Sequence, residues 1–184
     1  MFSRNVIVME GPDGGGKSTA AELLSRALGF PVIHTGGPLR TRVEFDNRVI
    51  DKRLMFARNC IFDRSPFLSE HVYSRLRTSP ALISMEETLT WLRMLKPLVI
   101  YCTLGDSETM RGLMLATHES KPHKSLEHVR EVWARADELH KAYTDLMKQI
   151  PPPQLLVYDW TAGTSPSEFV ETVRARLGEF ACAV

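Results

Sequence analysis

The stretch of sequence that decides the fold is VIVMEGPDGGGKST, residues 6–19. Its first four residues, Val6 to Met9, are apolar and predict a short buried strand. Residues 18–28 then place apolar side chains on one face of a helix, which Gly29 closes. A glycine-rich loop therefore connects a strand directly to a helix.

The loop at residues 11–19 matches the pattern G-x-x-x-x-G-K-S/T, with the strand before it and the helix after it that this pattern requires. Glycines are needed because the backbone must turn its N–H groups inward around a phosphate, where side chains would collide. The positive end of the helix dipole adds to the same anion site. A glycine-rich turn without a ligand is the alternative, but such a turn does not require Lys and Ser in this register. The loop therefore predicts a site for ATP.

The polar residues of the loop have expected roles. Lys17 is expected to bridge the β- and γ-phosphates of ATP, and the Ser18 hydroxyl is expected to ligate Mg²⁺. Asp13 is a candidate for a catalytic carboxylate. The residues expected to contact the nucleotide are Gly11, Asp13, Gly14, Gly15, Gly16, Lys17, Ser18 and Thr19.

The rest of the chain alternates short apolar runs with longer helical patterns, which is typical of a parallel sheet with crossover helices. The expected strands are residues 6–9, 31–34, 60–62, 98–104 and 155–158. The expected helices are residues 18–28, 41–57, 66–77, 85–95, 107–116, 126–149 and 167–177. We find no internal repeat, so the prediction is one α/β domain over residues 1–184, a five-stranded and mostly parallel sheet with helices on both faces.

Composition favours a soluble protein of the cytoplasm. The 23 Lys and Arg against 22 Asp and Glu give a net charge of +1, which does not call for nucleic acid, a membrane surface or an acidic partner. The three cysteines are an odd number without paired spacing, which favours a reduced compartment. The apolar run before Glu10 is too short for a signal peptide or a membrane span. A monomer and a homodimer are both compatible with this composition.

A second group of candidate residues follows the third expected strand. Asp63 and Arg64 come where that strand meets the next helix, at the carboxyl edge of the sheet, where ligands bind in open α/β sheets. The Arg is suited to hold an anion of the acceptor or the transferred phosphoryl group. The Asp is suited to order Mg²⁺ or to accept a proton. A salt-bridged strand end before Pro66 is the alternative interpretation.

With these motifs the chain resembles the thymidylate kinase and deoxynucleoside kinase branch of P-loop kinases. The resemblance rests on EGPDGGGKST at residues 10–19, on FDRSPFLSEHVYS at residues 62–74, and on the order of strands and helices. It implies that Asp63 and Arg64 act with Ser69 and Tyr73 to hold a nucleotide acceptor. The spacing to Ser69 and Tyr73 is one residue longer than in thymidylate kinases.

The chain departs from these kinases after the second strand, where it reads HTGGP at residues 34–38. Thymidylate kinases usually carry an Arg and an acidic residue there, so the basic contact to an acceptor phosphate is missing from this turn. Arg40 or Arg42 is a candidate replacement. Deoxynucleoside kinases place a catalytic carboxylate at the same point to deprotonate a sugar hydroxyl, and Asp63 or Asp13 is a candidate replacement for it.

The resemblance also implies a short lid that closes over ATP and excludes water. The corresponding segment is THESKPHKS, residues 117–125. Lys121 in this segment and Arg111 on the helix before it are expected to reach the phosphates of ATP. A solvated connection is the alternative interpretation of such a polar loop.

Residues 40–58 border the acceptor in the resembling kinases. Most apolar residues of this segment have the spacing of core positions on a helix, and most of its charges are expected to be solvated. Phe45, Arg48 and Arg53 are nevertheless candidates for the acceptor pocket. The tryptophans are expected to pack in the protein rather than to stack on a base.

The leading functional hypothesis is an ATP- and Mg²⁺-dependent kinase of deoxynucleoside monophosphates, most like a thymidylate kinase. Its nearest rival transfers the phosphoryl group to a hydroxyl, on a nucleoside or on a hydroxymethylpyrimidine base in DNA, and only this alternative makes nucleic acid a partner. A nucleotide-hydrolysing switch or motor is a third hypothesis from another class. Against it, the sequence has no second domain and no switch-like motif.

Overall fold

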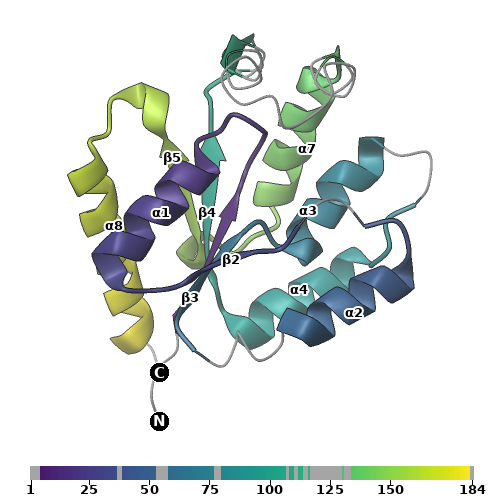
Figure 1. Cartoon of the computed structure of the whole chain (residues 1–184), viewed down its shortest axis with the longest axis horizontal. Coiled ribbons are helices and arrows are strands. Elements are labelled where there is room, and N and C mark those ends of the chain that lie inside the picture. The colour runs from purple at the N-terminus through teal and green to yellow at the C-terminus, as the bar shows by residue number, and fades with distance from the viewer. Residues whose placement is uncertain are drawn as a thin grey trace.

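The fold is built on a sheet of five parallel strands (Figure 1). The computed structural model describes residues 5–36, 39–52, 58–76, 80–106, 108–109, 112–113, 116, 130 and 134–182. The strands are β1 (Val6–Glu10), β2 (Val32–His34), β3 (Cys60–Asp63), β4 (Leu98–Thr103) and β5 (Leu155–Asp159). They lie in the order β2-β3-β1-β4-β5, and every pairing is parallel. The predicted sheet is confirmed, and β1 lies at its centre.

The helices follow the predicted pattern, with differences at their ends. The α-helices of the described residues are α1 (Lys17–Leu28), α2 (Arg42–Lys52), α3 (Pro66–Tyr73), α4 (Met85–Leu95), α7 (Ala136–Met147) and α8 (Pro166–Cys182). Short 3₁₀ turns are η2 (Ser74–Leu76), η3 (Pro152–Gln154) and η4 (Trp160–Ala162). Half of the residues of the helix predicted at 107–116, and most of the first turns of the one predicted at 126–149, lie outside the described residues. No helix in the described part of the chain is long and apolar enough to cross a membrane.

Helices cover both faces of the sheet (Figure 1). On one face α1 and α8 pack against Ile7 and Met9 of β1, and on the other face the core around α3, α4 and α7 packs against Val6 and Val8. Successive side chains of a strand point to opposite faces, which explains why one apolar strand supplies both halves of the core. A continuous apolar run is therefore needed at β1, as the sequence shows.

The same alternation decides where the last polar residue of each strand points. Glu10 continues the face of Val8, so its carboxylate meets Ser69 on α3. Asp63 continues the face of Ile61, so its carboxylate meets Ser18 on α1. Two adjacent strands thus deliver two carboxylates to opposite sides of the same sheet edge.

Candidate active site

The glycine-rich loop joins β1 to α1 and packs tightly against the end of β4. Gly11 has φ 140°, and a methyl group on it would lie 2.1 Å from the carbonyl oxygen of Cys102. A methyl group on Gly15 would lie 3.0 Å from the same oxygen. Inside the loop the Gly15 N–H donates to the Pro12 carbonyl at 3.1 Å. The loop conformation therefore requires glycine at residue 11 for steric reasons as well as for phosphate access.

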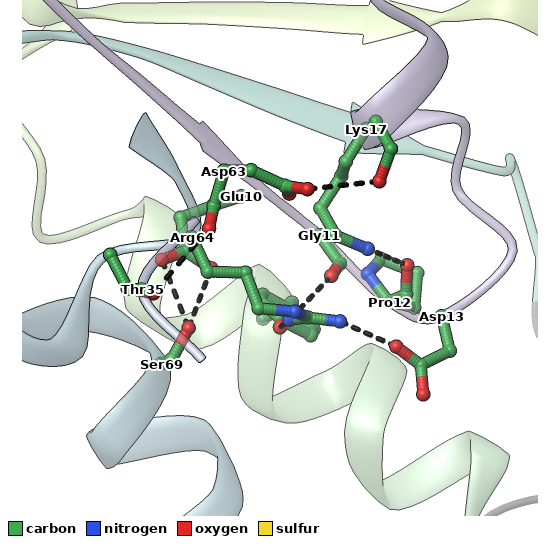
Figure 2. A network of polar contacts seen from close by, with 11 residues as sticks. Glu10, Gly11, Pro12, Asp13, Lys17, Thr35, Asp63, Arg64 and Ser69 are labelled. Carbon is green, nitrogen blue, oxygen red and sulfur yellow. Dashed lines mark hydrogen bonds and ion pairs between the residues drawn. The ribbon is translucent and has the colours of Figure 1, made fainter. Parts of the chain in front are cut away.

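Lys17 lies inside this loop. Lys17 is only 7% exposed, and its Nζ donates a hydrogen bond to the Pro12 carbonyl at 2.5 Å (Figure 2). Burial lowers the pKa of Lys17 to about 8, and the nearby Arg64 cation acts in the same direction, whereas Asp13 opposes it. The ammonium group is thus held within the loop, in the position from which it is suited to meet a phosphate.

Ser18 and Asp63 come together at the first turn of α1. The Ser18 hydroxyl donates to Asp63 Oδ2 at 2.9 Å, and His34 Nδ1 lies 3.2 Å from the same oxygen. The pairing of β2 with β3 places His34 opposite Asp63 in the sheet, which explains this contact. A hydroxyl and a carboxylate beside a phosphate loop are hard oxygen donors of the kind that Mg²⁺ prefers, with waters and phosphate oxygens completing its shell. These two residues fit the predicted magnesium site.

Arg64 ties the turn after β3 to the glycine-rich loop (Figure 2). Its guanidinium donates to the Gly11 carbonyl at 3.2 Å, to Tyr143 Oη at 2.7 Å and to Asp13 Oδ1 at 2.5 Å. The ring of Tyr73 lies below it, with its centroid 5.2 Å from Cζ. Although burial opposes the charge, Tyr143, Tyr73 and Asp13 raise the pKa of Arg64 above its ordinary value, so the group stays a cation.

Glu10 belongs to this site and was not a candidate in the sequence analysis. It is 0% exposed, and its Oε1 accepts a hydrogen bond from the Ser65 N–H at 2.6 Å. The Ser69 hydroxyl lies 3.1 Å from Oε1 and 3.2 Å from Oε2. Burial raises the pKa of Glu10, against the opposing effect of the Arg64 cation. One feature of the sequence does point to Glu10, since its carboxylate ends an otherwise apolar strand. A charge buried at such a position requires polar partners.

The residues predicted to contact the acceptor differ in their burial and in the groups that they contact. Ser69 is bonded to Glu10, and Tyr73 lies under the Arg64 guanidinium. Phe45 is 3% exposed and packs edge-on against Phe67, with ring centroids 5.3 Å apart.

Arg48 approaches the turn after β2. A methyl group on Gly36 would lie 3.5 Å from Arg48 Cζ and Nη2, and 3.6 Å from Nη1, so the guanidinium lies against this glycine. A cation from α2 therefore adjoins the turn that lacks a basic residue of its own. Of the other basic candidates, Arg40 lies just before α2 and Arg42 begins it, and the Arg42 guanidinium is paired with Asp46 and Glu87. Arg53, Arg111 and Lys121 lie outside the described residues, as does the expected lid at residues 117–125.

Trp160 is a second residue whose place the sequence did not indicate. It begins η4, directly after β5, and is 39% exposed. A methyl group on Gly16 would lie 2.9 Å from its Cδ1, so the indole lies against the glycine-rich loop. The buried Trp91, by contrast, stacks on Phe67 in the core, as expected for a packing residue.

Comparison with known proteins places this fold among kinases. No family model matches the sequence, and no curated protein matches it. Among solved structures, the YorR protein of Bacillus subtilis in complex with phosphorylated GDP matches at 20% identity over 98% of this chain and 99% of that chain, with a TM-score of 0.68. Thymidylate kinase from Candida albicans matches at 16% identity over 97% of this chain and 92% of that one, with a TM-score of 0.58.

A third similar structure is deoxyadenosine kinase from M. mycoides with bound dATP. It is 21% identical over 95% of this chain and 100% of that chain, with a TM-score of 0.52. At such identities the similarity shows the fold, and the chain has the fold of the P-loop kinases.

Proposed function

We propose that this protein is an ATP- and Mg²⁺-dependent phosphotransferase whose acceptor is a deoxynucleoside monophosphate. The observation that carries the proposal is the polar network in which the glycine-rich loop and the turn at residues 63–65 meet (Figure 2). Phosphoryl transfer requires mainly positioning and charge neutralisation, and this network brings cations, hydroxyls and carboxylates to one edge of the sheet.

The donor side of the site follows from the loop. The backbone N–H groups of the loop and Lys17 would bind the phosphates of ATP. Ser18, with Asp63 beside it, would hold Mg²⁺, which supplies charge neutralisation at the phosphates when it is bound. Arg64 already contacts the loop through Gly11 and Asp13, so its charge lies beside the phosphate site.

The acceptor side favours an anionic ligand. Arg48 brings a guanidinium to Gly36, which supplies a cation at the turn where thymidylate kinases carry their own. The Arg64 guanidinium lies over the Tyr73 ring, and Ser69 is hydrogen-bonded to the buried Glu10. The chain shares its fold with a thymidylate kinase and with a deoxyadenosine kinase, so the choice of acceptor rests on the site rather than on the fold.

A monophosphate is preferred over a hydroxyl acceptor because of how Asp63 is engaged. A hydroxyl must lose its proton during transfer, and Asp63 is the carboxylate assigned to that task under the rival hypothesis. Its Oδ2 accepts from Ser18, in the arrangement suited to magnesium. An ionised phosphate oxygen needs no base, so this engagement is compatible with a monophosphate acceptor.

The test is to incubate the protein with γ-labelled ATP, Mg²⁺ and one acceptor at a time. The acceptors are deoxynucleoside monophosphates, the corresponding nucleosides, and DNA containing hydroxymethylpyrimidine. The proposal expects label in a deoxynucleoside diphosphate. Label in a nucleoside monophosphate or in DNA would support the hydroxyl alternative, and release of inorganic phosphate alone, stimulated by a protein partner, would support the switch hypothesis.

A further inference from the structure

The backbone of Arg64 has an unusual conformation. Its φ is 71°, in the left-handed region that non-glycine residues rarely adopt because the conformation is strained for them. Two hydrogen bonds hold the chain on either side of this φ angle. The Arg64 N–H donates to the Met9 carbonyl at 3.0 Å, and the Ser65 N–H donates to the Glu10 carboxylate at 2.6 Å. Both acceptors come from the last two residues of β1.

The helix that follows does not need Glu10 as a cap. Ser65 is the N-cap residue of α3, and its own hydroxyl accepts from the Phe67 N–H at 3.2 Å, with Pro66 in the first turn. Glu10 instead holds the N–H of Ser65 and the hydroxyl of Ser69, one helical turn later. A carboxylate that is 0% exposed is costly to bury, and these contacts together with the Arg64 cation offset that cost.

We propose that Glu10 is a positioning residue that holds the turn at residues 64–65 and so fixes where the Arg64 guanidinium lies. In its present place the guanidinium reaches Gly11 and Asp13 of the glycine-rich loop. Loss of the Ser65 contact would let Arg64 relax to an ordinary negative φ, which would withdraw the guanidinium from the loop. The expected effect on turnover rests on the proposed function, whereas the effect on the backbone does not.

Two conservative variants of Glu10 distinguish the effect of its side-chain length from the effect of its charge. Glu10→Gln keeps the length of the side chain and an oxygen for the Ser65 N–H, and it loses the charge. Glu10→Asp keeps the charge and shortens the side chain by one methylene, which draws the oxygen away from the Ser65 N–H. A positioning role predicts that Glu10→Gln is the better enzyme, whereas a purely electrostatic role predicts that Glu10→Asp is.

Glu70 provides the matched control. It is also a buried carboxylate, 4% exposed, and it also accepts a backbone hydrogen bond, from the Leu82 N–H at 2.8 Å. That bond joins α3 to the segment before α4 rather than to the glycine-rich loop. Glu70→Asp therefore makes the same chemical change at a buried carboxylate without touching the turn at residues 64–65.

The first measurement is amide hydrogen exchange, resolved by residue, on the full chain. We expect the amides of Arg64 and Ser65 to exchange at least about tenfold faster in Glu10→Asp, which corresponds to 1.4 kcal/mol of lost protection, and to stay protected in Glu10→Gln and Glu70→Asp. Unchanged protection in Glu10→Asp would overturn the proposal. This measurement needs no substrate, so it is decisive even if the chain transfers no phosphoryl group.

The second measurement is steady-state transfer with the acceptor that the wild-type protein labels. We expect Glu10→Asp to lose on the order of 10²-fold in kcat/KM for the acceptor, with its affinity for ATP changed far less, because a misplaced Arg64 no longer matches the reacting geometry. Glu10→Gln should stay within about tenfold of wild type. Equal losses in both variants, a better Glu10→Asp than Glu10→Gln, or an equal loss in Glu70→Asp would contradict a positioning role.

Discussion

Lys17 combines deep burial with a cationic group. Its pKa, lowered by burial to about 8 from an ordinary value of 10.5, means that the folded chain loses this proton before the unfolded chain does. Between these two values the unfolded chain binds more protons, so the contribution of Lys17 to the free energy of unfolding rises with pH. The triphosphate of bound ATP has the opposite effect from burial. Its negative charge favours the charged ammonium and so raises the pKa of Lys17.

ATP binding should therefore be linked to proton uptake. At about pH 8.5 we expect binding to take up a proton at Lys17, and at about pH 6.5 to take up almost none there, because the group is already charged. The affinity for ATP should fall correspondingly as the pH rises above about 8. Isothermal titration calorimetry in two buffers of different ionisation enthalpy measures the uptake. Lys17→Arg keeps a permanent charge and should abolish the linkage, so identical uptake in that variant would count against the assignment.

Asp63 separates the two kinase hypotheses. Its Oδ2 is bonded to Ser18, so Asp63→Asn should raise the Mg²⁺ concentration needed for turnover and lower the rate by roughly tenfold if the acceptor is a monophosphate. If the acceptor is a hydroxyl, the same change should remove nearly all turnover, on the order of 10²–10⁴-fold, with ATP binding unaltered. Transfer rates measured over a series of Mg²⁺ concentrations distinguish these outcomes. Full wild-type activity in the mutant would be incompatible with both roles.

The loop between β1 and α1 makes a steric prediction. In Gly11→Ala the new methyl group would lie 2.1 Å from the Cys102 carbonyl oxygen, so the loop or the end of β4 must move. Gly29, which ends α1, is the matched control, since it has φ 72° and no atom within 4 Å of the added methyl group. Gly29→Ala should cost only about 1–2 kcal/mol of stability from backbone strain. Gly11→Ala should cost more than this and should also lose ATP binding.

Thermal unfolding and ATP titration of the two glycine variants check this prediction. The informative quantities are the differences in stability and in ATP affinity between the two variants. The backbone strain is common to both, because each places an alanine at a positive φ. Equal stability and equal ATP affinity in the two variants would show that the loop tolerates a side chain at residue 11, contrary to the packing seen here.

The strands and the first helix were predictable because their signals are local. The apolar run of β1 and the helical spacing of α1 each depend on residues close in sequence, and both elements lie within one residue of the expected bounds. Lys17 and Ser18 could be identified as candidates because the loop motif is contiguous. The helix expected at 66–77 was less well predicted, since α3 ends at Tyr73 and a 3₁₀ turn follows.

The partners of the site residues were not predictable in the same way. Glu10 meets Ser65 and Ser69 across 55 and 59 residues of sequence, and Arg64 meets Tyr143 across 79. No local pattern encodes such contacts, because they depend on how strands and helices pack in the finished fold. Trp160 reaches Gly16 for the same reason, through the position of β5 at the edge of the sheet.

The strand order brings these distant segments together. With β1 at the centre, its neighbours β3 and β4 deliver the turn at residues 63–65 and the Cys102 carbonyl to the two sides of the glycine-rich loop. All strands are parallel, so their carboxyl ends lie at one edge, where ligands bind in open α/β sheets. The arrangement of the whole sheet thus explains why one loop contacts both neighbouring strand ends.

The most direct test of the proposed phosphate site is the transfer rate of Lys17→Ala measured beside wild type, at saturating ATP and Mg²⁺ with γ-labelled ATP. Lys17 points into the loop rather than into the apolar core, so the variant should unfold at a similar temperature to wild type. Its transfer rate should fall by on the order of 10²–10³-fold or more, as expected for removal of one electrostatic stabiliser of the transferring group. A folded Lys17→Ala protein that retains more than about a tenth of wild-type transfer would contradict the assigned site.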